Sequence, residues 1–215
     1  MSTEIGFEPA KVQRALSSVQ NRYNMVAKKI VPDTKRNYVD EIANEWASDD
    51  AVAYFAKFKA KIDSLYKDVE KQMDSIFRSV KNAAQLMANL HGATWSPTDG
   101  NLNTISQELD VSTVKAMKDN KIFINPSKAT SIVTAWARTK SDINSELAGL
   151  KQDLNDAGFL SGDIQAAINH NIQSVVQSVG ATFDAMFNEA KTEIDNTVSK
   201  AEAQERTAKA QAAGN

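Results

Sequence analysis

The most restrictive feature of this sequence is a stretch from Asp33 to His91 that contains neither glycine nor proline. Among all 215 residues there are only eight glycines and four prolines, about half the usual share of these residue types. Because glycine and proline are the residues that most readily interrupt regular secondary structure, their scarcity favours long helices. We therefore expect an all-α chain.

Apolar residues at helical spacing define the first of these helices. They recur every three or four residues up to Ile30 and resume at Tyr38, beyond Pro32. The pattern predicts one amphipathic helix over residues 10–45, with a break or kink at Val31-Pro32-Asp33 because proline lacks a backbone donor. The apolar positions are Val12, Leu16, Val19, Tyr23, Val26, Ile30, Tyr38, Ile42 and Trp46.

A longer stripe predicts a second helix over residues 49–91. Its eleven apolar positions span 35 residues at a mean step of 3.5, which is the coiled-coil repeat. Ser48 or Asp49 is a suitable N-cap, and His91-Gly92 is a suitable end. The stripe consists of Phe55, Phe58, Ile62, Leu65, Val69, Met73, Ile76, Val80, Ala83, Met87 and Leu90.

Two further helices are predicted over residues 127–157 and 161–205, followed by a flexible tail over 206–215. The third helix has Trp136, Ile143 and Leu147 among its inward positions, and the fourth carries a stripe from Ile164 to Val198. Residues 92–125 are rich in glycine, proline, serine, threonine and asparagine, so we interpret them as a linker, with a short helix near 112–118. The first hairpin then occupies residues 1–91 and the second 126–205.

Composition excludes several classes of function. Without cysteine, and with only His91 and His170, the sequence offers no disulfide framework, thiolate zinc site or imidazole cluster, so we expect no metal or cofactor. Twenty-five basic against 27 acidic residues provide no general attraction for nucleic acid. The N-terminus resembles no signal peptide, and no apolar run suits a membrane span, so we expect neither stable membrane insertion nor export by a signal peptide.

The two halves of the chain resemble each other. Glu8-Pro9-Ala10-Lys11 and Asn125-Pro126-Ser127-Lys128 each open a helix with proline where a helix tolerates it. Trp46-Ala47-Ser48 and Phe159-Leu160-Ser161-Gly162 each place an aromatic residue and small residues between two helices. Reversing a helix in so few residues requires small side chains where the backbones approach, while the aromatic can cover the end of the core. A duplicated helical hairpin explains these similarities.

A long helix, a Trp-x-small turn and a second long helix resemble the WXG family, the ESAT-like hairpin proteins exported by type VII secretion systems. The resemblance covers residues 8–91 well and 125–205 loosely. Ser48 replaces the family's glycine, and Phe159 replaces its tryptophan in the second copy. Family members pair into four-helix bundles, so the resemblance implies an elongated, antiparallel four-helix bundle in which one chain contains both partners as a monomeric pseudo-dimer.

The resemblance also implies a function. It suggests a non-enzymatic protein, without catalytic residues, that is secreted by a signal-peptide-independent route after residence in the cytoplasm. Its expected partners are the export ATPase and a second secreted helical protein. Relatives carry a secretion signal in a C-terminal extension, which corresponds here to the segment containing Lys200, Glu202, Glu205 and Arg206. Tyr66 and Glu70 match the tyrosine-x-x-x-acid signal of relatives, but within a helix rather than in a tail.

Two other functions remain open at this level. A helical pore-forming toxin component would need a long apolar segment, and residues 86–95 are short and interrupted by His91-Gly92. An intracellular coiled-coil scaffold agrees with every periodicity but gives no reason for two aromatic-small turns. The carboxylates Asp63, Glu70 and Asp74 share a helical face, which we interpret as a solvated surface rather than an acid–base or metal site.

The length of the linker predicts how the hairpins are arranged. Parallel hairpins would need a connection of only about 2–8 residues, whereas this chain provides 34. An antiparallel pair requires the linker to run the length of a helix of about 42 residues, roughly 60 Å, which 34 extended residues can span. We therefore expect Trp46 and Phe159 at opposite ends.

Overall fold

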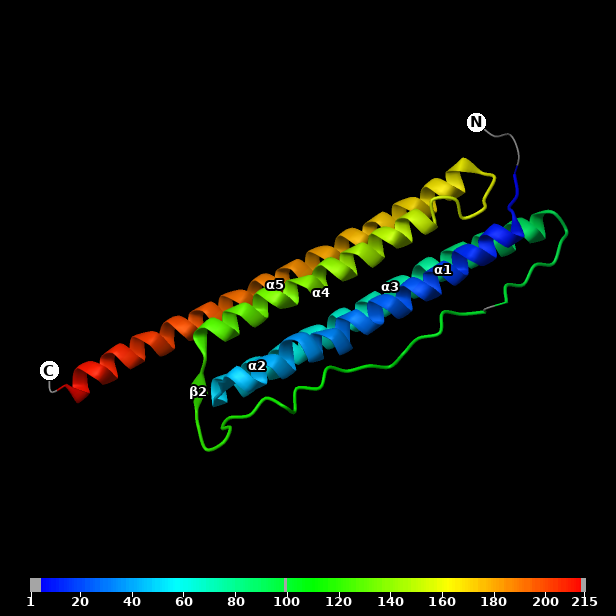
Figure 1. Cartoon of the computed structure of the whole chain (residues 1–215). Helices are drawn as coiled ribbons and strands as arrows, with labels where there is room; N and C mark the ends of the chain where they lie inside the picture. The colour runs from blue at the N-terminus through cyan, green and yellow to red at the C-terminus, as the bar shows by residue number, and fades with distance from the viewer. Residues whose placement is uncertain (1–4, 99, 214–215) are drawn as a thin grey trace.

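The computed structural model describes residues 5–98 and 100–213, and it confirms the all-α prediction. Long helices dominate it, and the only strands in the described residues are two of two residues each. The helices lie side by side along one long axis (Figure 1). The helical elements are α1 (Pro9–Lys28), η1 (Lys29–Asp33), η2 (Lys35–Val39), α2 (Asp40–Glu45), α3 (Asp49–Leu90), α4 (Pro126–Asp153) and α5 (Gly162–Ala212).

Of the break or kink predicted at Val31-Pro32-Asp33, the break is wrong, because the chain stays helical there, although the regular α-helix gives way to π-helical turns. The chain passes from α1 through two five-residue π-helical segments, η1 and η2, into α2. Ile30 and Tyr38 on either side of Pro32 are fully buried, so packing holds the helix together where proline removes a hydrogen bond. The wider π-helical turns also keep residues at steps of four on the buried face. In an α-helix, with 3.6 residues per turn, such a series would rotate steadily out of the core.

The apolar stripe of α3 shifts near its end, which corrects the sequence prediction there. Positions from Phe55 to Val80 are buried as expected, but the last buried positions are Ala84 and Ala88. Leu90 is 63% exposed, and Ala83 and Met87 are only partly buried. A straight helix drifts from a strict 3.5 repeat by ~20° per heptad, which moves the inward face by one residue over a helix of this length.

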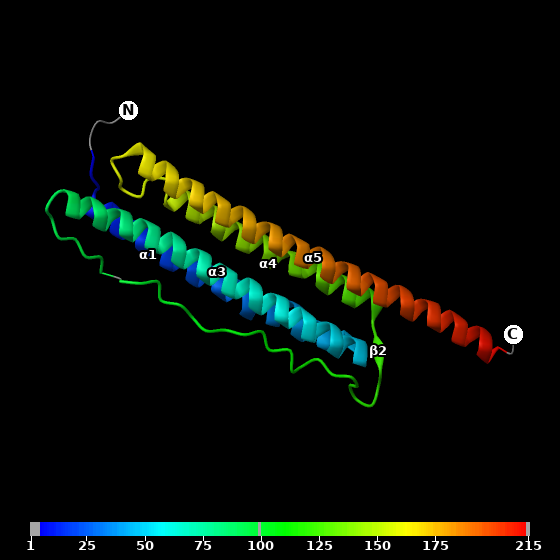
Figure 2. The same ribbon diagram turned by 180° about the vertical axis from the view of Figure 1, so that it is seen from behind.

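Both helices of the second hairpin end at other residues than predicted. The third helix stops at Asp153 rather than 157, because the next residues form turns in which the Gln165 side chain binds the Ala157 N–H and the Leu154 carbonyl. The fourth helix runs seven residues past its predicted end, to Ala212, so residues 206–212 of the predicted tail are helical. This last part of α5 projects past the other helices (Figures 1 and 2).

The two turns lie at opposite ends of the molecule. β1 (Trp46–Ala47) pairs antiparallel with β2 (Phe123–Ile124), directly before α4. The other turn meets the start of the chain, where Phe159 forms an isolated bridge with Phe7. Each hairpin therefore bends where the other begins or ends, as the linker length requires (Figure 1).

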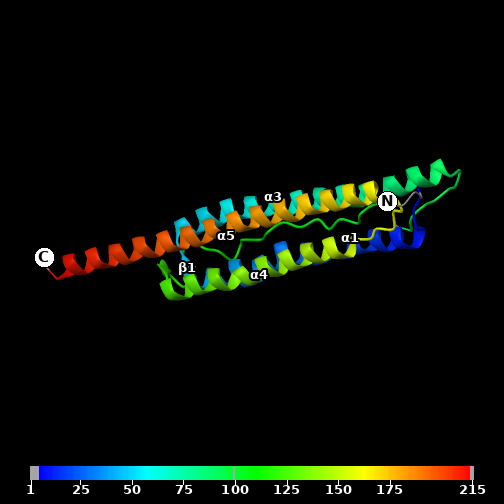
Figure 3. The same cartoon turned by 90° about the horizontal axis from the view of Figure 1, so that it is seen from above.

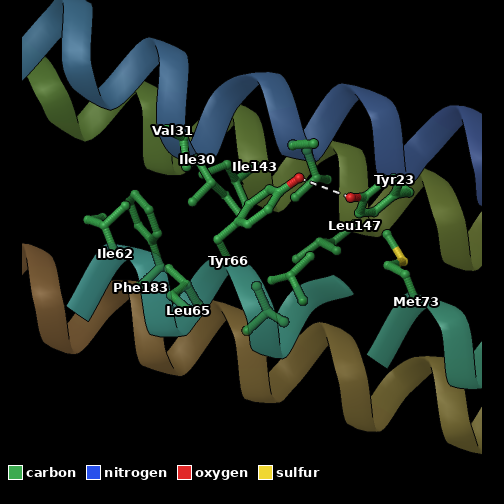
Figure 4. Packing of buried hydrophobic residues seen from close by; sticks show 14 of the residues in the cluster. Tyr23, Ile30, Val31, Ile62, Leu65, Tyr66, Met73, Ile143, Leu147 and Phe183 are labelled. Carbon is green, nitrogen blue, oxygen red and sulfur yellow. Dashed lines mark hydrogen bonds between the residues drawn. The ribbon is translucent and has the colours of Figure 1, made fainter. Parts of the chain in front are cut away.

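One continuous core runs between the helices. α1 packs against α3 and α4, and α5 packs against α3 and α4, so each of these helices has two long neighbours (Figure 3). The largest fully buried side chains include Trp136, Tyr23, Tyr38, Phe55 and Phe183. Figure 4 shows side chains from both hairpins meeting in this core.

The linker is an extended strap rather than a short helix. Residues 112–118 form turns and irregular structure, so the helix expected there is wrong. The Asp110 carboxylate accepts a hydrogen bond from the Ser112 N–H at 2.9 Å, and the Thr113 hydroxyl donates to Asp40 at 3.0 Å. The first bond is local and satisfies a backbone N–H outside a helix, and the second ties the strap to the start of α2. The strap follows the outside of the α1–α3 pair (Figures 1 and 2).

Candidate functional site

The Trp46-Ala47-Ser48 turn is a compact, covered reversal between two helices. The Ala51 N–H donates to Ser48 Oγ at 3.1 Å, so Ser48 caps α3 as predicted. Ala47 is fully buried, and Trp46 is 2% exposed with its ring centroid 5.9 Å from that of Tyr54. β2 pairs with the backbone of this turn, and the Asn125 N–H donates to the Glu45 carbonyl at 2.7 Å. The indole of Trp46 therefore closes the core and is not presented to a partner.

An aromatic cluster lies beneath this turn. The rings of Tyr38 and Trp136 stack with centroids 4.8 Å apart, and Trp136 Nε1–H donates to the buried Thr34 hydroxyl at 3.1 Å. The hydroxyls of Tyr38 and Tyr54 are 2.9 Å apart. Burial raises the pKa of both phenols, with the neighbouring charges adding a smaller effect. Both tyrosines are therefore neutral structural groups rather than acid–base groups near neutral pH.

The Phe159-Leu160-Ser161-Gly162 turn is closed by the start of the chain. The Leu160 N–H donates to the Gly6 carbonyl at 3.0 Å, and the Glu8 N–H donates to the Gly158 carbonyl at 2.7 Å. Phe159 is 8% exposed, whereas Gly162 has open space around its Cα. Ser161 occupies the N-cap position of α5 without a side-chain capping bond. Each turn thus buries an aromatic side chain. The first turn is covered by β2 and the second by the residues around Gly6 and Glu8.

The candidate chemical residues do not converge on a reaction centre. Among the three carboxylates on the α3 face, Asp74 pairs with Arg78 at 2.8 Å, while Glu70 accepts a bond from Tyr23 at 3.4 Å. His91 ends α3 with Nε2 2.8 Å from the Ile5 carbonyl oxygen, and His170 is exposed on α5. Within residues 5–98 and 100–213, no group of three metal-ligating side chains lies together.

A side-chain clamp on the strap was not apparent from the sequence. Tyr23 accepts a hydrogen bond from the Ile105 N–H at 2.9 Å, and Tyr66 donates to the carbonyl of the same residue. The two tyrosine hydroxyls are 2.9 Å apart (Figure 4). Asp63 accepts from the Leu109 N–H at 2.7 Å. The clamp therefore binds backbone groups of an extended segment. Tyr66, the tyrosine of the tyrosine-x-x-x-acid pattern, is buried in it.

One sequence signal could have indicated this clamp. Tyr23 lies in the apolar stripe of the first helix, and a buried tyrosine usually needs a partner for its hydroxyl. The partner itself could not be inferred, because Ile105 is 82 residues away along the chain.

The strap is also held near its start. Gln20 both donates to the Asn103 carbonyl at 3.0 Å and accepts from the Asn103 N–H at 2.7 Å. Leu102, Leu109 and Val114 are buried against the helices. The strap is thus part of the packed structure at several points along its length.

The C-terminal candidate segment is helical and exposed. Lys200, Glu202, Glu205 and Arg206 lie on α5, and all four are exposed. Glu205 pairs with Lys209 at 2.7 Å within the helix. A groove of about 260 Å³ between the start of α3 and α5 ends beside Asp50 and Lys200, where this segment begins.

Comparisons with known proteins add no assignment. No family model matches the chain, and no curated protein or solved structure matches it. Among the residues that the structure describes, no helix has both the length and the apolar character needed to cross a bilayer.

Proposed function

We propose that this chain is a non-enzymatic secreted protein of a type VII secretion system. In this proposal it is a WXG-like pseudo-dimer that carries two helical hairpins in one polypeptide. It acts by protein–protein contacts as a substrate, a co-secretion partner or an effector. Its first partner is the export ATPase, and it leaves the cell without a signal peptide.

The observation that carries the proposal is the pair of helical hairpins, each bent at an aromatic-small turn. In the first, Trp46 is buried at the junction of α2 and α3; in the second, Phe159 is buried at the junction of α4 and α5. The packing of α1 on α4 and of α3 on α5 supports a pairing of one hairpin with the other.

Fractionation of a native culture tests the proposal. We expect intact protein in the medium of the parent strain and only in cells of a strain that lacks the export ATPase. A cytoplasmic marker protein measured in the same fractions controls for lysis. Retention in both strains would contradict the proposal and favour the intracellular scaffold. Release in both strains would show a different export route.

A further inference from the structure

The last three turns of α5 have no helix beside them. Asp50, in the first turn of α3, lines the same groove as Lys200, so the bundle ends at this level. Residues 202–212 are all exposed, and this part of α5 projects past the other helices in every view (Figures 1, 2 and 3). We name residues 201–212 the α5 extension. An isolated helix of this length is marginal in water, so a partner would stabilise it.

Charges along one side of the α5 extension occur in a self-complementary order. Four charged residues lie on one side of this helix. Counted from Glu202, Glu205 is three residues on, Arg206 four and Lys209 seven. Read along the chain, two acidic residues precede two basic ones. A second copy running in the opposite direction would place Lys209 opposite Glu202 and Arg206 opposite Glu205. A second copy running in the same direction would place like charges together.

The centre of this charge pattern also matches the length of the free helix. The pattern is symmetric about the midpoint between Glu205 and Arg206, within about one residue of the middle of the α5 extension. Two extensions paired about that midpoint overlap almost completely, and each bundle begins where the other extension ends. In this pairing the bodies of the two molecules lie at opposite ends of the paired segment, because α5 projects past the other helices (Figure 1).

The side of the helix next to these charges continues the stripe that packs in the bundle. Ala190 and Ile194 are buried on α5, and Ala201, Ala208 and Ala212 follow at helical spacing. Alanine side chains allow two helices to approach closely, so that charged side chains beside the contact can reach across it.

We propose that the α5 extension is an interaction surface for a second copy of this chain, to which it binds in antiparallel orientation. The contact uses the same surface on both copies and is closed by a two-fold axis. The ion pair between Glu205 and Lys209 within one helix is then replaced by pairs between helices. Glu202, Glu205 and Arg206 also belong to the candidate secretion segment, but self-association is measured on the purified chain and does not depend on export. A dimer through α5 departs from the monomer expected from the sequence.

The association is expected to be weak and sensitive to salt. Exposed ion pairs each stabilise a contact only slightly and are screened as ionic strength rises. Sedimentation equilibrium of the full chain should therefore show a monomer–dimer equilibrium that shifts toward dimer at high protein concentration and low salt.

Charge reversal provides the decisive variants. Arg206→Glu with Lys209→Glu makes this side wholly acidic, and Glu202→Lys with Glu205→Lys makes it wholly basic. Each double variant alone should lose self-association by about tenfold or more, because like charges then face each other. An equal mixture of the two double variants should associate. The variant that carries all four substitutions restores the complementary order and should dimerise like the parent.

Spin labels can establish the orientation, because the chain has no cysteine and accepts a single introduced one. A label at Thr207→Cys should lie within about 5 Å of its mate along the helix axis, whereas a label at Ser199→Cys should be separated from its mate by roughly 20 Å along the axis. Equal distances at both positions would indicate parallel pairing and would overturn the proposal.

Two sedimentation results would also overturn it. One is a parent chain that stays monomeric up to millimolar concentration at low salt, and the other is a dimer unaffected by the double variants. Thermal unfolding followed by circular dichroism should give the same midpoint for all variants, which separates loss of pairing from loss of fold. A failure to export would leave these results unchanged.

Discussion

Gly158 is a residue at which both the backbone conformation and the close neighbours oppose a side chain. Its φ of +90° is a conformation that glycine adopts easily and other residues rarely do. A Cβ placed there would lie 2.6 Å from Cβ of Lys11 and 3.1 Å from the Glu8 carbonyl oxygen. The second turn and the start of α1 therefore approach each other more closely than an alanine would allow.

Gly158→Ala should destabilise the protein by about 1–3 kcal/mol, through backbone strain and this close contact. Gly162→Ala is the matched control, since nothing lies within 4 Å of a Cβ there and the residue begins a helix. The control should change the free energy of unfolding by less than about 1 kcal/mol. Urea denaturation of both variants measures the difference. Equal stabilities would contradict the close approach seen at Gly158.

These residues also show what the sequence could and could not predict. Ser48 is a predictable cap, because its bond is to Ala51, three residues away. The burial of Trp46 follows from the need to cover the core at a tight helix reversal. Gly158 could be predicted only as a helix end, because its constraint comes from Lys11, 147 residues earlier in the chain.

At the level of elements, the π-helical segments had a signal in the sequence. Val26, Ile30, Thr34, Tyr38 and Ile42 are all buried and follow at steps of four. A regular helix would rotate such a series out of the core, so a run of fours around Pro32 indicates wider turns. The strap had no comparable signal, because its conformation depends on helix side chains far away along the chain.

Hydrogen exchange can test whether the strap is held by separate local contacts. Tyr23→Phe removes the acceptor of the Ile105 N–H, and Asp63→Ala removes that of the Leu109 N–H. Each variant should accelerate exchange of its own amide by about five- to tenfold, as expected for one lost hydrogen bond, and leave the other unchanged. Equal acceleration of both amides in either variant would show that the strap opens as one unit.

The whole molecule contains four tyrosines, and three of them have a raised pKa. Burial is the main cause for Tyr38, Tyr54 and Tyr66, since it disfavours the phenolate. Because the pKa of each is higher in the folded chain than its ordinary value of 10, their contribution to stability is complete below pH 10. That contribution decreases as the pH rises above 10.

A spectroscopic base titration follows from this difference. In the native protein, the phenolate absorbance of three tyrosines should appear well above pH 10, or only as the chain unfolds. In urea, all four should ionise near their ordinary pKa. Native titration of more than one tyrosine near pH 10 would contradict the burial of these hydroxyls.

Deletion of residues 200–215 tests the proposed secretion signal at the level of the whole chain. This part of α5 contributes almost nothing to the core, so the thermal midpoint should change by less than about 3 °C. We expect export to be abolished. Normal secretion of the truncated protein at equal expression would exclude the signal role, and the charge-reversal variants test pairing separately.

The bridge between Phe7 and Phe159 also has a consequence for the order in which the protein forms during synthesis. The ribosome must make about three quarters of the chain before Phe7 can meet Phe159. Before α4 and α5 are made, the hairpin of α1 and α3 has no second hairpin to cover its inner face, because the strap lies on its outer side. A ribosome-bound chain stopped before residue 126 should therefore present a long apolar surface to the chaperones of the cell.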